Sequence, residues 1–175
     1  AVNRSLFLQK HTGRKLECNF KLSSLLDIPS EGEGIYDLVW MEQTFHHLEP
    51  RDEMVKKCAG LLRPGGWIVI SEANALNIPL QLQLFIRRGF PKIKEMQGSD
   101  GRVHLYGDER ITTAQAIKGR FKKNNIIPIS VRYFRMFPNK SFFDYFSWLE
   151  SFPGVSKVSP LFTQFNYVGM KEGVF

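Results

Sequence analysis

Apolar and polar positions follow one another along this chain in blocks that predict strands and helices in turn. Residues 38–41 and 67–70 are two short, nearly continuous apolar runs, which is typical of strands buried on both faces of a parallel sheet. Between them, apolar residues recur at the spacing of one helix face: Met54, Val55, Cys58, Leu61 and Leu62. The pattern predicts a strand, a crossover helix and a second strand, with Pro64-Gly65-Gly66 as the turn before the second strand.

Further elements are predicted on either side of this unit. Upstream we expect a helix over residues 2–11 and a half-buried strand over 16–22, where apolar and polar residues alternate. Downstream, Pro79 and Gly89 favour a helix over residues 78–88, although alternating leucines leave a strand open there. The two sides therefore add both helices and strands to the central unit.

The last third of the chain continues in the same way. Thr112-x-x-Gln115 is a capping-box signature and predicts a helix to about residue 124. Residues 127–133 and 162–171 predict two more strands. Between them we expect a helix over 142–152 whose aromatic residues cover more than one face. Packing against the sheet, a lid over an apolar ligand and a contact with a membrane surface all remain open for this helix.

The composition fits a single globular domain. The chain has 175 residues, of which 43% are hydrophobic and 23% are charged, so it can bury a core and is not expected to be disordered. No apolar run approaches the roughly 20 residues that span a bilayer. Cys18 and Cys58 lie in a predicted strand and a predicted helix, which favours buried thiols over a disulfide framework or a zinc site. We therefore expect a reducing, cytoplasmic setting.

The chain carries a net charge of +7, which raises the question of an anionic partner. Its basic residues are scattered, with small clusters at Arg87-Arg88, at Lys92 and Lys94, and over residues 118–123. A solvated surface explains them better than a nucleic-acid site, because the sequence has neither a dense basic stripe nor a stacked-aromatic RNA module. A membrane surface remains open as a partner.

The stretch YDLVWMEQTFHHLEP, followed by LLRPGGWIVISEAN, resembles the second half of the class I S-adenosylmethionine (SAM)-dependent methyltransferases. Within that family it is similar to the small-molecule enzymes of the ubiquinone-biosynthesis type. The acidic, glycine-rich loop that follows the family's first strand is absent from this sequence. The resemblance covers essentially the whole chain. It implies an α/β, Rossmann-like sheet in which strands three to seven are present, the first two are missing and the last strand is antiparallel.

From this resemblance we expect residues 1–175 to be a partial methyltransferase domain, with an insertion or lid over about 78–110. The family's strand order, 3-2-1-4-5-7-6, would leave strand three without its neighbour, and unpaired buried backbone is costly. The sequence is therefore expected to be a segment of a longer protein or one half of a complex, and to be inactive alone.

The resemblance also implies a cofactor site. At the position of Ser24, next to Leu25, family members carry an acid that meets the adenine of SAM. A serine hydroxyl can bond the adenine amine, but less strongly than a carboxylate. Met41, Glu42 and Gln43 lie at the carboxyl end of a predicted strand, where ligands bind in open α/β sheets. These five residues are expected to line the pocket of SAM and of its product, S-adenosylhomocysteine.

The adjacent histidines His46 and His47 are the candidate catalytic residues. Imidazole titrates near neutral pH, so either ring can serve as a general base towards an acceptor that must lose a proton. A metal site is disfavoured, because adjacent side chains rarely point together and no carboxylate or cysteine spacing supports one. The alternative is that one histidine caps or packs the following turn.

The sequence thus predicts an enzyme that transfers a methyl group from SAM to a small-molecule or lipid-like acceptor without a metal. Methylation of oxygen, nitrogen or carbon remains open, as does the oligomeric state. The serine at Ser24 and the absent glycine loop support an alternative, a non-catalytic methyltransferase-like binding or scaffolding module. An RNA methyltransferase is a third possibility, against which the scattered charge argues.

Overall fold

The computed structural model describes residues 25–28, 34–97, 101–136, 145–152, 154–155 and 158–173. The helix predicted over residues 2–11 and the strand over 16–22 lie outside these ranges, and so do Cys18 and Ser24. The elements predicted from residue 36 onwards lie largely inside them.

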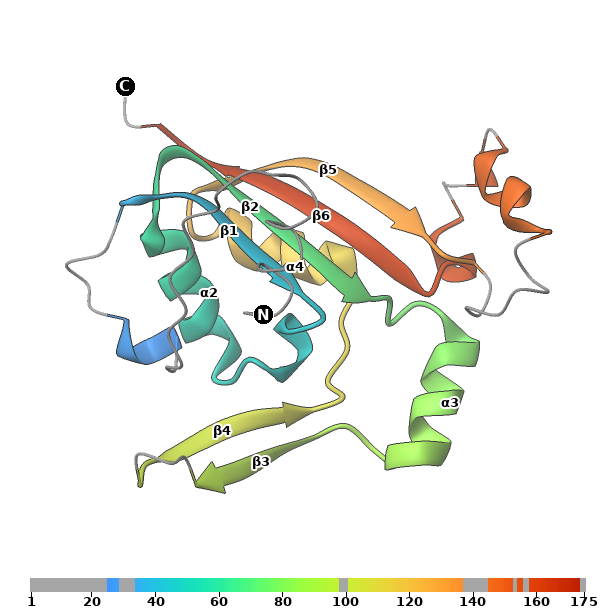
Figure 1. The fold of residues 1–175 in the computed structure, drawn as a ribbon, viewed down its shortest axis with the longest axis horizontal. Helices are drawn as coiled ribbons and strands as arrows, with labels where there is room; N and C mark the ends of the chain where they lie inside the picture. The colour runs from blue at the N-terminus through green and yellow to red at the C-terminus, as the bar shows by residue number, and fades with distance from the viewer. Residues whose placement is uncertain are drawn as a thin grey trace, which may run out of the picture.

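Four strands form one mixed sheet, in the order β1 (Tyr36–Glu42), β2 (Leu62–Ala73), β6 (Gln164–Lys171) and β5 (Ile126–Phe134). β1 runs parallel to β2, with Met41 opposite Ile70. β6 runs antiparallel to both β2 and β5, so the predicted antiparallel last strand is confirmed. Figure 1 shows the four strands as one twisted layer.

Two helices, α2 (Arg51–Leu61) and α4 (Ala114–Lys122), lie on one side of this sheet (Figure 1). α2 is the predicted crossover between β1 and β2, and it buries Met54, Val55 and Cys58. Among the described residues, four short 3-10 helices complete the framework: η1 (Leu25–Asp27), η3 (Phe45–His47), η4 (Ser147–Ser151) and η6 (Ser159–Leu161). The predicted strand–helix–strand unit is confirmed.

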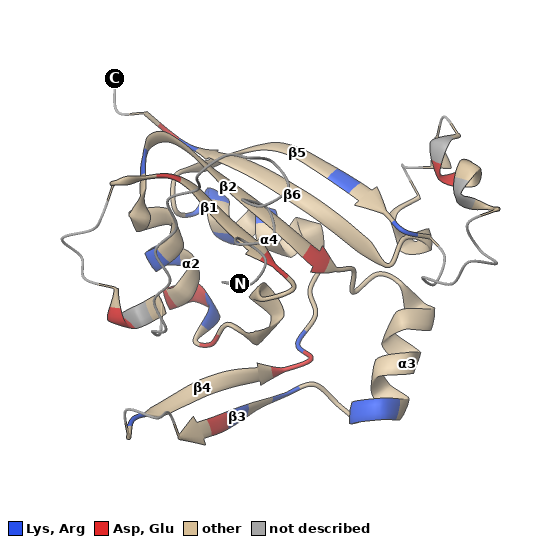
Figure 2. Ribbon diagram, viewed as in Figure 1, with Lys and Arg blue, Asp and Glu red and all other residues tan. Residues whose placement is uncertain are grey.

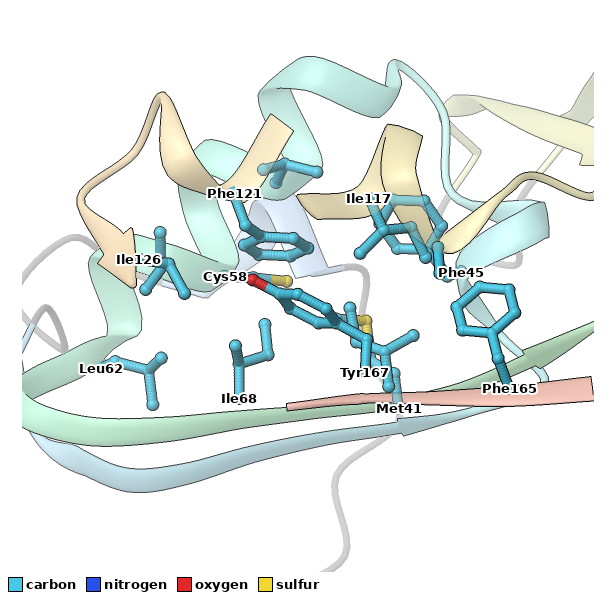
Figure 3. Close-up of a cluster of buried hydrophobic side chains, with 14 residues drawn as sticks. Met41, Phe45, Cys58, Leu62, Ile68, Ile117, Phe121, Ile126, Phe165 and Tyr167 are labelled. Carbon is cyan, nitrogen blue, oxygen red and sulfur yellow. The ribbon is translucent and has the colours of Figure 1, made fainter. Parts of the chain in front are cut away.

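The core lies between these two helices and the sheet. Figure 3 shows aromatic and aliphatic side chains from both layers meeting there. The ring of Phe121 on α4 stacks on that of Tyr167 on β6, with centroids 6.0 Å apart, and both side chains are fully buried. Cys58 is buried in the same cluster, as predicted, and burial raises the pKa of its thiol to about 12.

Apolar side chains on the opposite face of the sheet are exposed. They include Leu38 and Trp40 on β1 and Trp67 on β2. Successive side chains of a strand point to opposite faces, so these residues belong to the same apolar runs that predict strands buried on both sides. Within the described ranges, only one of the two faces is covered.

The segment between β2 and α4 forms an arm that extends from the sheet (Figure 1). We use "the arm" for α3 (Ile78–Arg88) together with β3 (Lys92–Gln97) and β4 (Val103–Asp108), which pair antiparallel. α3 begins at Asn77, whose side chain accepts a hydrogen bond from the backbone N–H of Leu80. The helix predicted over residues 78–88 is confirmed, whereas the hairpin that follows is not among the sequence predictions.

The arm buries little apolar surface of its own. No residue of α3 is buried, and every residue of β3 is exposed. Figure 2 shows that α3 carries no charge except at its C-terminal end, where Arg87 and Arg88 lie. We use "the sheet half" for the four-stranded sheet with α2, α4 and η3. The arm meets the sheet half where β4 contacts η3. There, a Cβ added at Gly107 would lie 2.5 Å from the carbonyl oxygen of His46, so only glycine allows this approach.

Two local predictions need correction. Helix α4 is capped by Thr113, whose hydroxyl accepts a hydrogen bond from the N–H of Ala116, while Thr112 pairs with Asn74 in an isolated bridge. Pro64-Gly65-Gly66 lies inside β2 rather than before it. The pairing with β1 is irregular there: Tyr36 pairs with Leu62, and Leu38 pairs with Trp67. β2 therefore begins before these three residues and continues after them.

The aromatic segment near the C-terminus also differs from the predicted helix. The part that the structure describes, residues 145–152, forms a turn and the 3-10 helix η4. Tyr145, Trp148 and Phe152 are exposed, and the rings of Trp148 and Phe152 pack together with centroids 5.2 Å apart. Of the alternatives considered for this segment, packing against the sheet is therefore wrong for these three aromatic side chains.

Candidate functional site

A cavity of about 530 Å³ lies at the carboxyl ends of β1 and β2. Parallel strands leave their carboxyl ends at one edge of a sheet, and ligands of open α/β sheets bind there. The loop after β1, the end of β2, the arm and the segments next to β5 and β6 all contribute to its wall. Polar groups come from Gln43, His46, Asn77, Gln83, Arg135 and Gln164. The volume suits a small molecule.

His46 lines this cavity and is held by a buried carboxylate. Its Nδ1 lies 2.7 Å from Oε2 of Glu72 near the end of β2, and both side chains are almost completely buried. The other oxygen of Glu72, Oε1, accepts a hydrogen bond from the backbone N–H of Phe45 at 2.6 Å. Nε2, on the opposite edge of the His46 ring, has no hydrogen-bond partner among the described residues. One nitrogen of a cavity-lining imidazole is thus left available.

His47 has different surroundings. Its Nδ1 donates a hydrogen bond to the carbonyl oxygen of Gly107 at 2.7 Å, and its Nε2 lies 3.1 Å from the hydroxyl of Tyr106. The ring also stacks on that of Tyr106, with centroids 4.4 Å apart. Both nitrogens are therefore engaged with the arm, and His47 is not among the residues that line the cavity. This geometry fits the packing alternative for His47.

Three residues with left-handed backbone conformations line the same cavity. Gln43 has φ 49°, Glu109 has φ 52° and Arg135 has φ 59°, and they come from three separate segments. A left-handed conformation costs a non-glycine residue about 1–2 kcal/mol. Such strain is held in place by its surroundings and collects at functional sites. The strained backbone is therefore a second indication, independent of His46, that this cavity is a functional site.

A second cavity of about 400 Å³ adjoins the first one at the arm. Leu84, Glu109 and Ile111 line both cavities. The rest of the second wall is mainly apolar and includes Leu82, Phe85 and Phe90. A ligand that occupied both cavities would therefore meet polar groups near His46 and apolar groups along α3.

The candidate cofactor residues lie in different surroundings. Leu25 in η1 packs against the core, and Met41 is buried in it. Glu42 and Gln43 are exposed at the end of β1, and their side chains make no hydrogen bond with another described residue. Ser24 lies outside the described ranges. Of these five candidates, the structure places Gln43 in the cavity that His46 lines.

Two ion pairs lie near the cavity. Glu109 lies 3.8 Å from Arg88. Nζ of Lys94 donates to Asp108 at 2.5 Å, and this hydrogen bond holds the pKa of the Asp108 carboxyl below its usual value. The described side chains include no group of three or more His, Cys, Asp or Glu that could hold a metal ion. No helix in the described ranges is long and apolar enough to cross a membrane.

Glu72 and Arg135 are among the members of this site that sequence reasoning misses. Glu72 is a carboxylate at the carboxyl end of an apolar strand, in the row of core-facing positions, which is a usable signal for a buried partner. Its contact with His46 spans 26 residues and cannot be read from spacing. Arg135 follows β5, and nothing in the sequence indicates that this strand ends near His46.

Comparison with known proteins gives matches at the level of sequence. A family described as a methyltransferase domain matches residues 3–70, which include β1, α2 and most of β2. A ubiquinone biosynthesis O-methyltransferase from Bordetella avium (strain 197N) is 30% identical over 63 residues, which is 36% of this chain and 25% of that protein. The aligned part of the chain thus spans a quarter of the length of this relative.

Solved structures show the same architecture. A putative sarcosine dimethylglycine methyltransferase from Galdieria sulphuraria aligns with a TM-score of 0.58 at 14% identity, over 97% of this chain and 65% of that one. A [4+2]-cyclase, SpnF, aligns with a TM-score of 0.56 at 12% identity, over 99% and 63% of the two chains. At these identities the likeness concerns the fold alone, and the predicted Rossmann-like sheet is confirmed.

Proposed function

We propose that this chain is part of a class I SAM-dependent methyltransferase, and that the whole protein transfers a methyl group from SAM to a hydroxyl group of a small molecule. The family match and the fold support the reaction type. The observation that carries the proposal is the buried pair of His46 and Glu72 at a cavity beside the carboxyl ends of β1 and β2.

The described residues supply part of a cofactor site. Glu42 and Gln43 present a carboxylate and an amide at the end of β1, and neither side chain is bonded to another described residue. Such groups fit the hydroxyl and amino groups of SAM. When bound, SAM supplies an electrophilic methyl group on a sulfonium centre. The remaining task of the protein is to align the acceptor and to exclude water.

His46 fits the role of the general base. A hydroxyl group is a better nucleophile when its proton is removed as the methyl group is transferred. With Nδ1 bound to Glu72, Nε2 of His46 is the nitrogen that can accept this proton. His47 has partners for both of its nitrogens, so we assign the base to His46 and a packing role to His47.

The two adjoining cavities support an acceptor with a polar head and an apolar part. The hydroxyl group would lie near His46, and the apolar part would lie against Leu82, Phe85 and Phe90 of the second cavity. The similarity to an O-methyltransferase of ubiquinone biosynthesis supports transfer to oxygen. The arm, which forms much of the second cavity, would then be the lid expected over about residues 78–110.

The test uses the full-length protein. Calorimetric titration with S-adenosylhomocysteine comes first, followed by transfer of labelled methyl from SAM to phenols with and without alkyl chains. We expect micromolar binding of S-adenosylhomocysteine and faster transfer to the alkylated phenols. His46→Gln should lower turnover on the order of 10²–10⁴-fold while leaving S-adenosylhomocysteine affinity within about threefold. His47→Gln is the matched control, with both quantities close to those of the unmodified protein.

Two results would contradict the proposal. Absence of S-adenosylhomocysteine binding by the full-length protein would remove the methyl donor. Equal losses of turnover and of S-adenosylhomocysteine affinity in His46→Gln would remove His46 from proton transfer.

The solved cyclase with the same fold motivates a second candidate, in which the domain binds a ligand without transferring a methyl group. Binding of S-adenosylhomocysteine together with an absence of methyl transfer across the phenols would favour this candidate.

A further inference from the structure

We propose that Glu72 is the positioning residue that fixes the tautomer of His46. In this arrangement the proton resides on Nδ1 and Nε2 keeps a free lone pair. The inference rests on the proposed function, because it concerns the same imidazole, and it adds a residue that neither the family match nor the sequence assigns.

The geometry around Nδ1 carries the inference. An ionised carboxylate only accepts hydrogen bonds, so the 2.7 Å contact between Oε2 of Glu72 and Nδ1 of His46 requires a proton on Nδ1. The side chain of Glu72 is 1% exposed and that of His46 is 9% exposed, so water does not compete strongly for this bond. The hydrogen bond on one ring nitrogen thus selects the protonation state of the other.

Glu72 is itself held by the backbone. Its Oε1 accepts from the N–H of Phe45 at 2.6 Å, and its Oε2 also lies 3.3 Å from the N–H of Ala73. Each oxygen therefore faces at least one fixed donor, and the carboxylate cannot rotate without losing a bond. Because Phe45 directly precedes His46, one carboxylate fixes both the start of η3 and the orientation of the ring.

Three groups lie close to the His46–Glu72 pair. The ring of His47 lies 3.9 Å from that of His46, measured between centroids, and β4 brings the backbone of Gly107 against the carbonyl group of His46. Arg51 on α2 interacts electrostatically with Glu72, but it forms its ion pair with Glu49, at 3.4 Å. Within the described ranges, Glu72 is therefore the acidic partner of His46.

The substitution Glu72→Gln should change the tautomer of His46 without changing the packing around it. The amide oxygen should take the place of Oε1, because the 2.6 Å bond from Phe45 is the shortest backbone bond that the carboxylate accepts. The amide NH₂ group would then face Nδ1 of His46 and donate to it. This reverses the tautomer and places the proton on Nε2, while the shape of the side chain is conserved. In a Ser-His-Asp triad, the corresponding change of the acid to its amide lowers turnover on the order of 10⁴-fold through the wrong histidine tautomer.

The experiment measures the tautomer directly and needs no acceptor. The full-length protein is labelled with ¹⁵N-histidine, saturated with S-adenosylhomocysteine and studied by long-range ¹H–¹⁵N NMR at pH 7.5. The His46 signals are assigned by their loss in His46→Gln. We expect a protonated Nδ1 and an unprotonated Nε2 in the unmodified protein, and the opposite pattern in Glu72→Gln. Glu49→Gln is the control, because Glu49 is a second buried carboxylate that bonds to Arg51 and Arg110 but not to His46.

Each outcome decides the proposal. A proton on Nε2 of the unmodified protein, or protons on both nitrogens, would overturn it without any variant. Retention of the Nδ1 proton in Glu72→Gln, or the same reversal in Glu49→Gln, would assign the tautomer to another cause. Should Glu72→Gln fail to fold, Glu72→Asp replaces it, because the shorter carboxylate keeps the charge and should lengthen the bond to Nδ1, which moves the Nδ1 proton signal upfield. An unmoved signal would contradict the proposal. S-adenosylhomocysteine binding is measured on the same samples, so a loss of the methyl-donor site is detected separately from a change of tautomer.

Discussion

The sheet half and the arm use apolar residues in opposite ways. Between the sheet and helices α2 and α4, Phe121 and Tyr167 are fully buried and stack on each other. In the arm, α3 buries no residue, and Phe85 and Phe90 contact each other at the surface with centroids 4.9 Å apart. The sheet half is thus stabilised by its own core, whereas the apolar residues of the arm contribute to a cavity wall.

The contacts of the arm with the rest of the molecule differ in kind from those of the core. They are mostly polar or made by the backbone: Asn77 donates to the carbonyl oxygen of Pro160, His47 donates to that of Gly107, and Leu48 pairs with Tyr106 in an isolated bridge. Such contacts fix a position but release little hydrophobic free energy. Changes in the arm should therefore alter binding more than global stability.

The largest expected effect is the removal of a core ring. Phe121→Ala should lower the free energy of unfolding by about 3–5 kcal/mol, because it removes a fully buried ring and leaves a cavity beside Tyr167. Urea denaturation measures the change. Phe90→Ala in the arm is the matched control, since Phe90 is 79% exposed, and it should change the free energy by less than about 0.5 kcal/mol. Similar losses in the two variants would show that the arm shares the core's stability.

Alkaline pH should act mainly on the sheet half. Burial raises the pKa of Cys58 to about 12 and that of Tyr167 to about 12, so between pH 9 and pH 12 the folded state binds more protons than the unfolded state. Stability therefore falls as the pH rises through this range. From pH 8 to pH 11 the thiol alone should account for about 3 kcal/mol. Urea denaturation along this pH series should give a flatter profile for Cys58→Ala, and an unchanged slope would contradict the assignment to the thiol.

An intermediate effect is expected where the two regions touch. Gly107→Ala places a methyl group 2.5 Å from the carbonyl oxygen of His46, so either β4 or η3 must move. We expect a loss of about 1–3 kcal/mol in stability and altered NMR signals of His46. Gly119→Ala in α4 is the control, because its Cβ would meet no atom within 4 Å, and it should stabilise the helix by up to about 1 kcal/mol. An unshifted His46 signal in Gly107→Ala would mean that the arm does not influence the base.

The smallest effect concerns the two helix caps. Thr113→Ala removes the cap of α4 and should cost about 1 kcal/mol in global stability. Asn77→Ala removes the cap of α3, so we expect faster amide hydrogen exchange in α3 with little change in the exchange of β2 and β6. Equal exchange changes in both regions would indicate that arm and sheet unfold together.

The sequence predicts the sheet half better than the arm, and for a physical reason. α2 and β2 each bury one face in the core, and burial imposes the periodicity from which they are predicted. β3 is exposed along its whole length, so no apolar alternation is required of it and the hairpin leaves no signal. The cap at Thr113 shows the usual error of one residue when two threonines adjoin.

The candidate site is predictable in part. His46 and Gln43 are found because they follow an apolar strand, and ligands bind at the carboxyl ends of such strands. The choice between His46 and His47 depends on Glu72 and Gly107, which lie 26 and 60 residues away in the chain. The sequence alone does not show which of two adjacent histidines faces the cavity, and only their tertiary contacts distinguish them.

The left-handed residues of the cavity have a consequence for protein engineering. Glycine adopts positive φ without strain, so glycine at the positions of Gln43, Glu109 or Arg135 should raise the melting temperature. A selection for heat resistance would therefore collect such substitutions, and each would remove a side chain from the cavity. Asn125 also has a positive φ, 59°, but does not line the cavity. It is the position at which thermal stability can be improved without exchanging a binding group.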